Sequence, residues 1–301
     1  MITYKRLYKP ENLKENQIIL DIETTGLDSS KDQLVLLGII AYENDKCYIM
    51  QYFAEDDDEE KRVLQIYLEK IIDKEIVNFN GDKFDIPFLN NRLIANDLFP
   101  VFPESYDLLK VISSRRKFFV FESMRLIDLE KKIGIFRDDP SRYKVISKLT
   151  EDIIKRDKPK PIMIHNENDL IATEKLSNIE DYFNDELSIG IDNNKITINS
   201  VWINNDIGSF ILSSQDILED SYFTGPNYEL RTNKNIIEIN LQVLYGMFDD
   251  KTKGFVSLNT FNLDNLTSVR VDPNLFVIKE NHIYKYKNIL NLCKKIIENH
   301  L

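Results

Sequence analysis

The order of apolar segments between residues 17 and 97 constrains the fold more than any other feature of the chain. Three apolar or alternating runs follow one another with only short turns between them: 17–25, 34–44 and 46–55. A helix-spaced run, a short apolar run and a second helix-spaced run come next: 59–72, 75–80 and 84–97. Short turns predict an antiparallel meander, and helical crossovers predict parallel strands. The pattern therefore predicts an α/β domain with a mixed sheet flanked by helices.

The remaining chain changes character after about Asn184. Before it, a further short strand is expected at 104–109, and helical patterns fall at 108–116, 125–134, 143–156 and about 163–183. After it, regularly spaced turn signals separate hairpin-like segments at 189–203, 235–261 and 274–287, and a closing helix is expected at 286–301. We therefore expect one domain over residues 1–184. A smaller, mostly β region ending in a helix follows over 185–301.

Composition indicates a globular protein of the reducing interior of a cell. No stretch approaches the roughly 18 apolar residues of a membrane helix. The N-terminus lacks the apolar region of a secretory signal. Cys47 and Cys293 lie far apart without metal-ligand spacing, which favours reduced core residues. We expect a cytoplasmic protein with no membrane association.

The charge of the chain is unevenly distributed. A net charge of −11 argues against a nucleic-acid partner, because phosphate binding normally requires a basic surface. Residues 110–160, however, hold 15 Lys and Arg against 8 Asp and Glu, a net +7 that leaves −18 on the rest. This segment is either a track for a phosphate backbone or the solvated faces of amphipathic helices. The acidic run 55–60 is expected to be a solvated loop and a helix start. The apolar run 118–121 suits a core, or else a platform for bases.

Three distant segments each carry acidic residues. Asp21 and Glu23 share one face of an expected buried strand, because side chains at i and i+2 project together. Asp85 follows a strand at the start of a helix, and His165 and Asp169 lie one helical turn apart. Each segment also has an ordinary structural explanation. Asp21 and Glu23 could lie on the solvent-exposed face of an edge strand, Asp85 could be a helix cap, and His165 could be a core residue. Together, four carboxylates match two Mg²⁺ or Mn²⁺ ions, which suits phosphodiester hydrolysis.

Motifs of other hydrolytic and nucleotide-binding chemistries are missing from the sequence. It contains no GxxxxGK[ST], no GxSxG and no HExxH. The segments DIETTGL, NFNGDKFDIPFL and HNENDL resemble the three exonuclease motifs of the DEDD (DnaQ-like) superfamily, which has a ribonuclease H-like fold. Their wording is most similar to the YprB-type ribonuclease H-like domain family. The resemblance covers residues 17–180, and residues 185–301 match no pattern.

The resemblance implies a two-metal 3′–5′ exonuclease of DNA or RNA that acts on a single-stranded 3′ end. Asp21 would bridge both ions, and Glu23 and Asp169 would complete the site of the ion that activates water. Asp85 would hold the second ion, largely through water. His165 would activate that water. Three residues separate His165 from Asp169, whereas the histidine branch of the family has four.

The resemblance also implies substrate contacts. Thr24 would contact the terminal nucleotide, and Asn80 would lie beside the scissile phosphate. Leu27 and Phe84 are candidates to wedge or stack on bases. From charge alone, Arg115–Lys117 are candidates for phosphate contacts. The alternatives are a catalytically silent nucleic-acid-binding module and a protein scaffold that retains the fold, and the presence of all four acids favours the enzyme.

Overall fold

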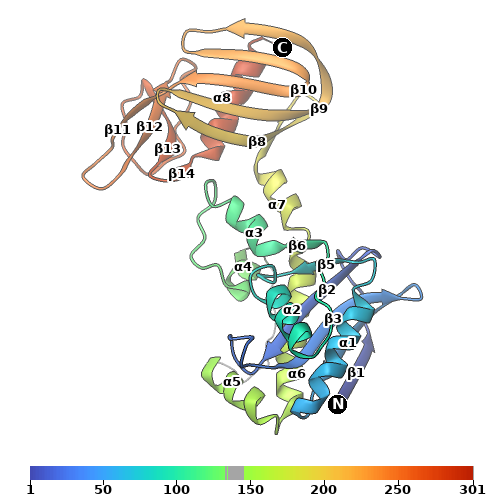
Figure 1. Ribbon diagram of the computed structural model, residues 1–301. Helices are drawn as coiled ribbons and strands as arrows, with labels where there is room; N and C mark the ends of the chain where they lie inside the picture. The colour runs from blue at the N-terminus through green and yellow to red at the C-terminus, as the bar shows by residue number, and fades with distance from the viewer. Residues whose placement is uncertain (133, 135–145, 301) are drawn as a thin grey trace. The chain divides into compact units, whose positions relative to one another are not determined.

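The computed structural model describes residues 1–132, 134 and 146–300, which form two compact units (Figure 1). The first unit comprises Met1–Ser113 and Phe121–Ile179, and the second comprises Ser114–Val120 and Glu180–Leu301. The expected boundary after residue 184 thus falls five residues beyond this division. The short segment Ser114–Val120 joins the second unit, a return of the chain that no sequence pattern signalled.

The first unit is built on a six-stranded mixed sheet. Its strands are β1 (Ile2–Leu7), β2 (Gln17–Thr24), β3 (Leu34–Glu43), β4 (Lys46–Phe53), β5 (Glu75–Asn78) and β6 (Ser105–Asp107). They lie in the order β1-β4-β3-β2-β5-β6. The pairs from β1 to β2 are antiparallel, and β2, β5 and β6 run parallel. The expected meander and parallel crossovers are confirmed, whereas β1, a mostly polar edge strand, was not expected.

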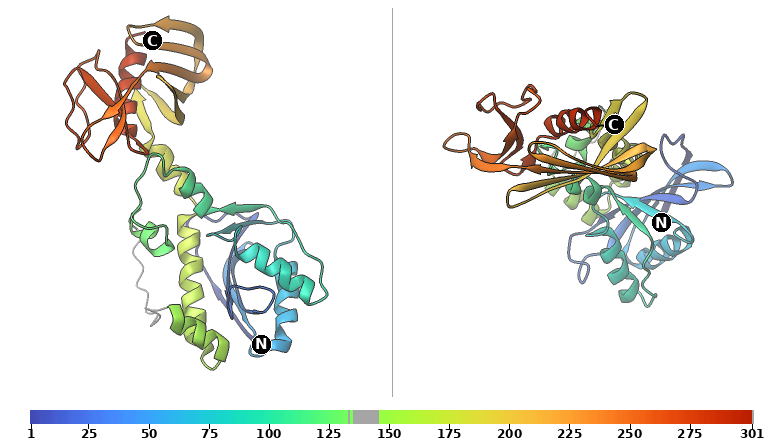
Figure 2. Two further views of the ribbon diagram at one scale, coloured as in Figure 1. Left: turned by 60° about the vertical axis from the view of Figure 1, so that its left-hand side comes forward. Right: turned by 90° about the horizontal axis from the view of Figure 1, so that it is seen from above.

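Helices cover both faces of this sheet (Figures 1 and 2). The first unit contains η1 (Asp57–Glu59), α1 (Glu60–Lys70), α2 (Asp85–Ala95), α3 (Leu108–Ser114), α4 (Leu126–Lys132), α5 (Ile146–Lys155) and α6 (Pro159–Leu176). A large apolar core joins α1 and α2 to one face, and a smaller one joins α5 and α6 to the other. Of the helix expected at 143–156, residues 143–145 lie outside the described residues.

The long helix expected at 163–183 is wrong in its extent. The structure has two helices instead, α6 and α7 (Ile179–Glu186). At the break, the hydroxyl of Ser177 donates to the carbonyl of Glu174 at 2.7 Å. A serine side chain that bonds a helix carbonyl competes with the next helical hydrogen bond, which favours a helix end at this point. At the other end, Pro159 lies in the first turn, where its missing N–H is tolerated.

The alternation of β2 decides which way its acidic residues point. Ile18, Leu20 and Ile22 belong to the core beneath α1 and α2. Residues at odd positions of a strand project to the opposite face, so Asp21 and Glu23 face the α6 side of the sheet. Strand β2 therefore has an apolar face toward α1 and α2 and an acidic face toward α6.

The second unit contains two antiparallel four-stranded sheets and α8 (Tyr286–Glu298). Its strands are β7 (Ser188–Ile191), β8 (Asn194–Asn204), β9 (Ile207–Thr224), β10 (Tyr228–Gln242), β11 (Leu244–Met247), β12 (Lys253–Leu258), β13 (Leu275–Glu280) and β14 (Ile283–Tyr284). Helix α8 contacts β7 and β10 of one sheet and β13 of the other. The expected mostly β region with a closing helix is confirmed.

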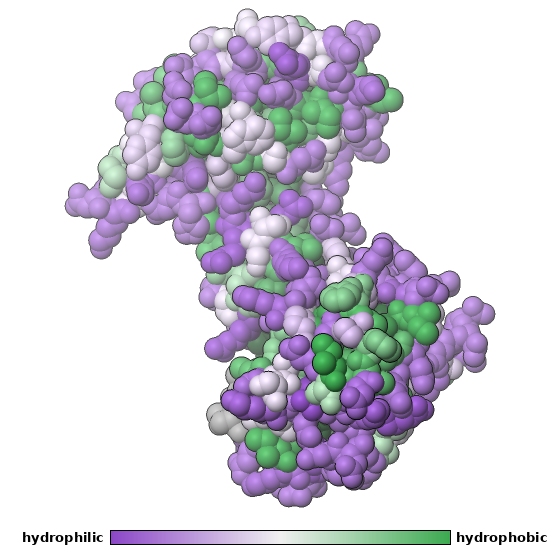
Figure 3. Space-filling view, viewed as in Figure 1, coloured by the Kyte–Doolittle hydropathy of each residue, from purple (hydrophilic) through white to green (hydrophobic). Residues whose placement is uncertain are grey.

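The hairpin expected across 235–261 is confirmed in its second half, and the pairing expected of its first half is wrong. Strand β10 pairs with β9, a long strand that was not expected, and β11 pairs with β12. The surface in Figure 3 is largely hydrophilic with scattered apolar areas. Within the described residues, no helix is long and apolar enough to cross a membrane.

Candidate active site

Two half-buried carboxylates, those of Asp21 and Glu23, project from the end of β2. The pKa of Asp21 is raised well above its ordinary value, first by burial and then by the charges of Asp85, Asp169 and Glu23. The pKa of Glu23 is raised by burial and by the charges of Asp169 and Asp85. The carboxylates of Asp85 and Asp169 therefore lie close enough to oppose the ionisation of the two acids on β2.

Asp85 begins α2 and is only 7% exposed. Its Oδ1 accepts a hydrogen bond from the backbone N–H of Ile22 at 3.3 Å, which connects the start of α2 to β2. Burial raises the pKa of Asp85 to about 7, although this hydrogen bond opposes the shift, and the charge of Asp107 adds to it. A carboxyl that is desolvated to this degree is typical of a functional site.

A tight turn between β5 and α2 positions Asp85 next to β2. After β5, the side chain of Asn78 accepts a hydrogen bond from the N–H of Gly81 at 2.7 Å. A Cβ atom at Gly81 would lie 2.6 Å from Cγ of Asn78, so a larger residue would displace this cap. Asn80 adopts the left-handed conformation with φ of 68°, which asparagine tolerates better than most residues. The polar residues of this motif thus build the turn itself.

Asp169 and His165 belong to α6, which packs on β2 and β3. The Nε2 of His165 lies 3.6 Å from Oδ2 of Asp169, and the two side chains are 21% and 23% exposed. Spacing of four along a helix places both on one face, as the sequence predicts. The histidine ring and the fourth carboxylate are therefore neighbours at the rim of the acidic cluster.

The donor set of this cluster fits hard divalent cations. Carboxylate oxygens are the ligands that Mg²⁺ and Mn²⁺ prefer, and mutual repulsion among buried acids is what a cation would relieve. Among residues 1–132, 134 and 146–300, however, no three His, Cys, Asp or Glu side chains stand in an arrangement that could hold a metal ion. The carboxylates would therefore have to turn toward a common point to hold one.

A family model described as the RNase_H superfamily matches residues 18–179, a range that contains all five of these residues. The chain belongs to the RNase H superfamily. It is 28% identical over 168 residues to the uncharacterized protein YprB of Bacillus subtilis, covering 53% of this chain and 40% of that protein. It is 29% identical over 150 residues to a PolC-type DNA polymerase III of Ureaplasma parvum, covering 42% of this chain and 10% of the polymerase. The chain thus spans less than half of the length of either relative.

Solved structures of exonuclease I resemble parts of this superfamily member. One is an E. coli exonuclease I complex with single-stranded DNA, with a TM-score of 0.36 and 13% identity over 66% of this chain and 54% of that one. Another is E. coli exonuclease I with a dT13 oligonucleotide, with a TM-score of 0.37 and 12% identity over 66% and 55% of the two chains.

Two residues expected to contact substrate, Thr24 and Leu27, lie at the end of β2 and in the turn after it. Thr24 donates its hydroxyl hydrogen bond to the carbonyl of Gly26 at 2.6 Å, so its side chain shapes the turn after the strand. Leu27, in the same turn, is 84% exposed. An apolar side chain this exposed has no role in the core. It follows the acidic pair by only four residues.

The other two residues expected to contact substrate, Asn80 and Phe84, lie at the turn into α2. The backbone N–H of Asn80 donates to Oδ1 of Asp107 at 2.9 Å, and its side chain is half-buried. The ring of Phe84 is also half-buried, with its centroid 5.6 Å from that of Phe88, and it packs against the larger core. Phe84 therefore has a structural contact in addition to any contact with a base.

The predicted basic residues Arg115–Lys117 lie in the segment that joins the second unit. Arg116 is exposed, and Arg115 and Lys117 are half-buried. The ammonium of Lys117 donates to the carbonyl of Val201 at 3.4 Å, and burial lowers its pKa. The next two residues, Phe118 and Phe119, are buried against aromatic rings of that unit, so they are core residues there. Arg137, Arg142 and Lys144 of the basic segment lie outside the described residues.

Two polar residues of the site were missed by the sequence patterns. Asp107 ends β6 directly beside Asn78 of β5, and it is 5% exposed. An acid at the carboxyl end of a strand parallel to β5 was the signal that could have found it. Asn166 is fully buried on α6, and its amide donates to Oδ2 of Asp21 at 2.7 Å. It directly follows His165, and only the structure reveals its contact with β2.

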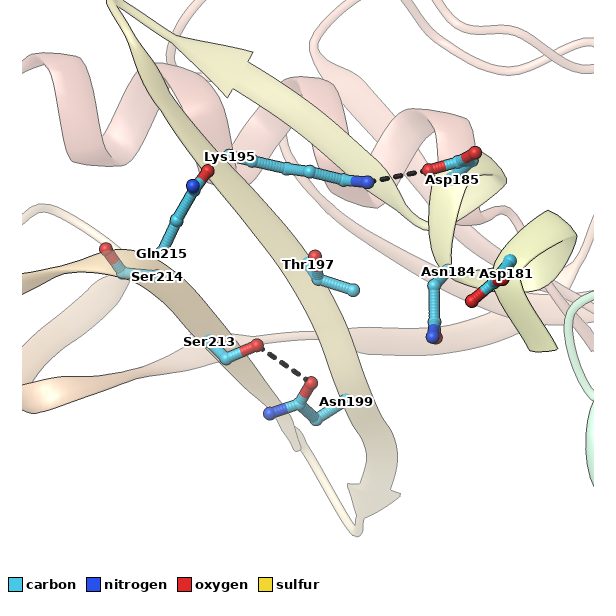
Figure 4. Close-up of a pocket in the computed structure, with 9 residues that line it drawn as sticks. All are labelled: Asp181, Asn184, Asp185, Lys195, Thr197, Asn199, Ser213, Ser214 and Gln215. Atoms are coloured by element: carbon cyan, nitrogen blue, oxygen red, sulfur yellow. Dashed lines mark hydrogen bonds and ion pairs between the residues drawn. The ribbon is translucent and has the colours of Figure 1, made fainter. Parts of the chain in front are cut away.

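The second unit has a polar hollow of about 580 Å³ between α7 and the strands β8 and β9 (Figure 4). In it, Lys195 pairs with Asp185 at 2.6 Å, and the hydroxyl of Ser213 donates to Asn199 at 3.1 Å. Four of the nine residues that line it thus satisfy one another in pairs. None of the residues that line the hollow is one of the predicted site residues.

Proposed function

We propose that this protein is a metal-dependent nuclease that removes nucleotides from a 3′ end of DNA or RNA. The observation that carries the proposal is the group of carboxylates on β2, α2 and α6, in which the charges of Asp85 and Asp169 raise the pKa values of Asp21 and Glu23. Membership of the RNase H superfamily supports the fold, and the DNA polymerase relative supports a nucleic-acid substrate. Desolvated acids of like charge have little structural purpose, because they destabilise the chain that carries them.

Asp21, Glu23, Asp85 and Asp169 would hold Mg²⁺ or Mn²⁺, in two sites. When bound, such ions supply positive charge to the phosphate in the transition state and make water a better nucleophile at neutral pH. Asp85 is fixed for this task by its hydrogen bond from Ile22. Asp21 is fixed by its hydrogen bond from Asn166.

His165 would take the proton from the attacking water. A ring nitrogen of an imidazole that lies beside the metal-ligating carboxylates can accept this proton as a general base. Asp169 lies 3.6 Å from Nε2, where its charge would stabilise the protonated ring. The exposed side chain of Leu27 would pack against the terminal base, and Thr24 holds the turn that presents it.

A cleavage assay tests the proposal. The full chain is incubated with single- and double-stranded DNA and RNA that carry a label at the 5′ or the 3′ end, with Mg²⁺, with Mn²⁺ and with EDTA. We expect metal-dependent loss of nucleotides from the 3′ end, and no cleavage by Asp21→Asn. Asp45→Asn is a matched control, because Asp45 is an exposed turn residue of the same unit.

Each outcome of this assay has a distinct reading. Release of single nucleotides from the 3′ label supports the exonuclease, and internal fragments would support an endonuclease of the same superfamily. Binding of nucleic acid without cleavage in either metal would refute the enzyme and leave a binding module. Cleavage that persists in Asp21→Asn would assign the activity to a contaminant.

A further inference from the structure

A row of three residues crosses the central strands behind the acidic cluster. Asp21 on β2 is paired with Gly38 on β3, and Gly38 is paired with Gln51 on β4. All three face α6, because their neighbours Ile22, Leu37 and Met50 belong to the core on the opposite face. The middle residue has no side chain, so the row has a gap at its centre.

The amide of Asn166 fills that gap. A Cβ atom at Gly38 would lie 2.0 Å from Oδ1 of Asn166, so no other residue type fits at this position without moving the amide. Through the gap, Gln51 Nε2 donates to Asn166 Oδ1 at 2.8 Å, and Asn166 Nδ2 donates to Asp21 Oδ2 at 2.7 Å. Both Gln51 and Asn166 are fully buried.

The direction of these hydrogen bonds is fixed from the far end. Gln51 Nε2 also donates to the backbone carbonyl of Met163 on α6 at 2.7 Å. A carbonyl can only accept, so the NH₂ end of Gln51 must face it. The same NH₂ group then requires the oxygen of Asn166 on its side, which leaves the NH₂ of Asn166 for Asp21. The amide of Asn166 therefore has one orientation that satisfies both Gln51 and Asp21.

This arrangement comes with an unsatisfied group. Oε1 of Gln51 is buried without a hydrogen-bond partner in the described part of the chain. Native proteins leave few buried acceptors unpaired, because each is destabilising. Turning the Gln51 amide around would place its oxygen against the carbonyl of Met163, so this orientation is retained in spite of that penalty.

We propose that Gly38, Gln51 and Asn166 form a positioning relay that holds the carboxylate of Asp21 in one orientation as a hydrogen-bond acceptor. Asn166 and Gln51 are positioning residues, because they act on the reaction through Asp21. Groups that hydrogen-bond a metal-ligating carboxylate are responsible for its orientation, and their loss weakens metal binding or activity by about 10- to 100-fold. The catalytic consequence rests on the proposed nuclease function, but the relay itself can be tested without it.

The first test measures stability with EDTA present. Gln51→Glu removes the donor to Asn166. The side chain of Asn166 then has a carboxylate on each side, and its one NH₂ group can donate to only one of them. Asp21→Asn adds an amide that can donate back to Asn166 and removes that conflict. We expect Gln51→Glu to change the unfolding equilibrium constant about tenfold less in the Asp21→Asn background than in the wild type, a coupling of the size seen for residues of one network.

Repeating this cycle in the Asn166→Ala background separates the relay from direct repulsion between residues 21 and 51. We expect the coupling to vanish there, because Asn166 carries it. A coupling that persists would assign it to through-space repulsion and overturn the relay, as would the absence of any coupling in the wild type. If Asn166→Ala fails to fold, Asn166→Leu serves instead, because it retains a branched side chain that neither donates nor accepts a hydrogen bond.

The second test measures Mn²⁺ affinity and cleavage by the full chain. We expect Asn166→Ala to weaken Mn²⁺ binding about 10- to 100-fold. Glu167→Gln is the matched control on the same helix, since Glu167 pairs with Arg6 instead of Asp21. If Asn166→Ala binds Mn²⁺ as the wild type does, the relay does not position Asp21 and the inference fails. If the wild type neither binds Mn²⁺ nor cleaves, the proposed function fails, and the coupling in EDTA still decides the relay.

Discussion

Replacing Asp85 by asparagine should stabilise the protein when no divalent metal is present. Burial raises the pKa of Asp85 from 3.8 to about 7 in the folded chain. The folded state therefore binds more protons than the unfolded state between these two values, and stability falls as the pH rises through this window. Asparagine does not titrate, and its side-chain oxygen retains an acceptor for the N–H of Ile22, 3.3 Å from Oδ1 in the wild type.

The magnitude follows from the size of this shift. One pKa unit corresponds to 1.36 kcal/mol, so the ionised carboxyl destabilises the fold by about 4 kcal/mol at pH 8 and by about 2 kcal/mol at pH 5. Asp85→Asn should recover most of that difference, with a gain that shrinks as the pH is lowered. The effect is large compared with the roughly 5–15 kcal/mol by which domains are stable.

Urea unfolding with EDTA present at pH 5 and pH 8 measures the gain. Far-UV circular dichroism follows the whole chain, and the fluorescence of Trp202, the sole tryptophan, reports on the second unit separately. Asp45→Asn should be neutral at both pH values. The reasoning is refuted if Asp85→Asn is no more stable than the wild type at pH 8, or if its gain is equal at pH 5.

Three further substitutions test other parts of the structure. Asp21→Asn should lower cleavage by at least about 100-fold while circular dichroism shows an unchanged fold, because it removes a charge that would hold the metal ions. Glu60→Gln should destabilise the chain by about 3–5 kcal/mol in urea unfolding, because Glu60 is 2% exposed and is paired with Arg92 at 2.7 Å. Burial alone would raise the pKa of Glu60, but hydrogen bonds from Arg92 and other groups lower it. The stability that the ionised Glu60 contributes is therefore lost as the pH falls through that lowered pKa, and the wild type should become less stable in acid. Arg116→Glu should weaken nucleic-acid binding and reduce its salt dependence by about one unit of slope, and unchanged binding would mark Arg116 as a solvated surface residue.

The sequence patterns predicted a layered α/β domain with a mixed sheet because period and turn chemistry are local properties, and the resemblance of three motifs implied the RNase H-like fold. Apolar runs located β2 and β3, and alternation located β4, to within two residues at each end. The same reasoning missed β1, whose residues are mostly exposed and polar, and β9, whose second half is largely exposed. Strand segments whose residues are mostly exposed bury too little apolar surface to leave a pattern, even where the strand lies inside its sheet, as β9 does. The pairing of β10 with β9 was missed for the same reason.

The acidic residues were predictable from the sequence, but the residues that hydrogen-bond and orient them were not. Asp21 and Glu23 stand out because acids in an apolar strand are costly. Asn166, by contrast, lies in a polar stretch of helix, and its importance comes from a gap at Gly38 that is 128 residues away in sequence. Likewise, no pattern revealed that Glu60, the last residue of an acidic run, is buried against Arg92 while its neighbours are solvated. Contacts between distant segments depend on the tertiary structure, so no local sequence pattern predicts them.

The register of the meander connects these distant residues. The hairpin between β3 and β4 turns at Asn44 and Asp45, whose φ values of 48° and 61° both lie in the left-handed region. A two-residue turn of this kind fixes which residues face each other along both strands. It thereby sets Gln51 opposite Gly38, and β2 sets Asp21 beside them. A slip of one residue would move Gln51 to the opposite face and leave Asn166 without its donor. The orientation of Asp21 therefore depends on the left-handed backbone of an exposed turn that never touches it, a conformation that Asn and Asp both adopt.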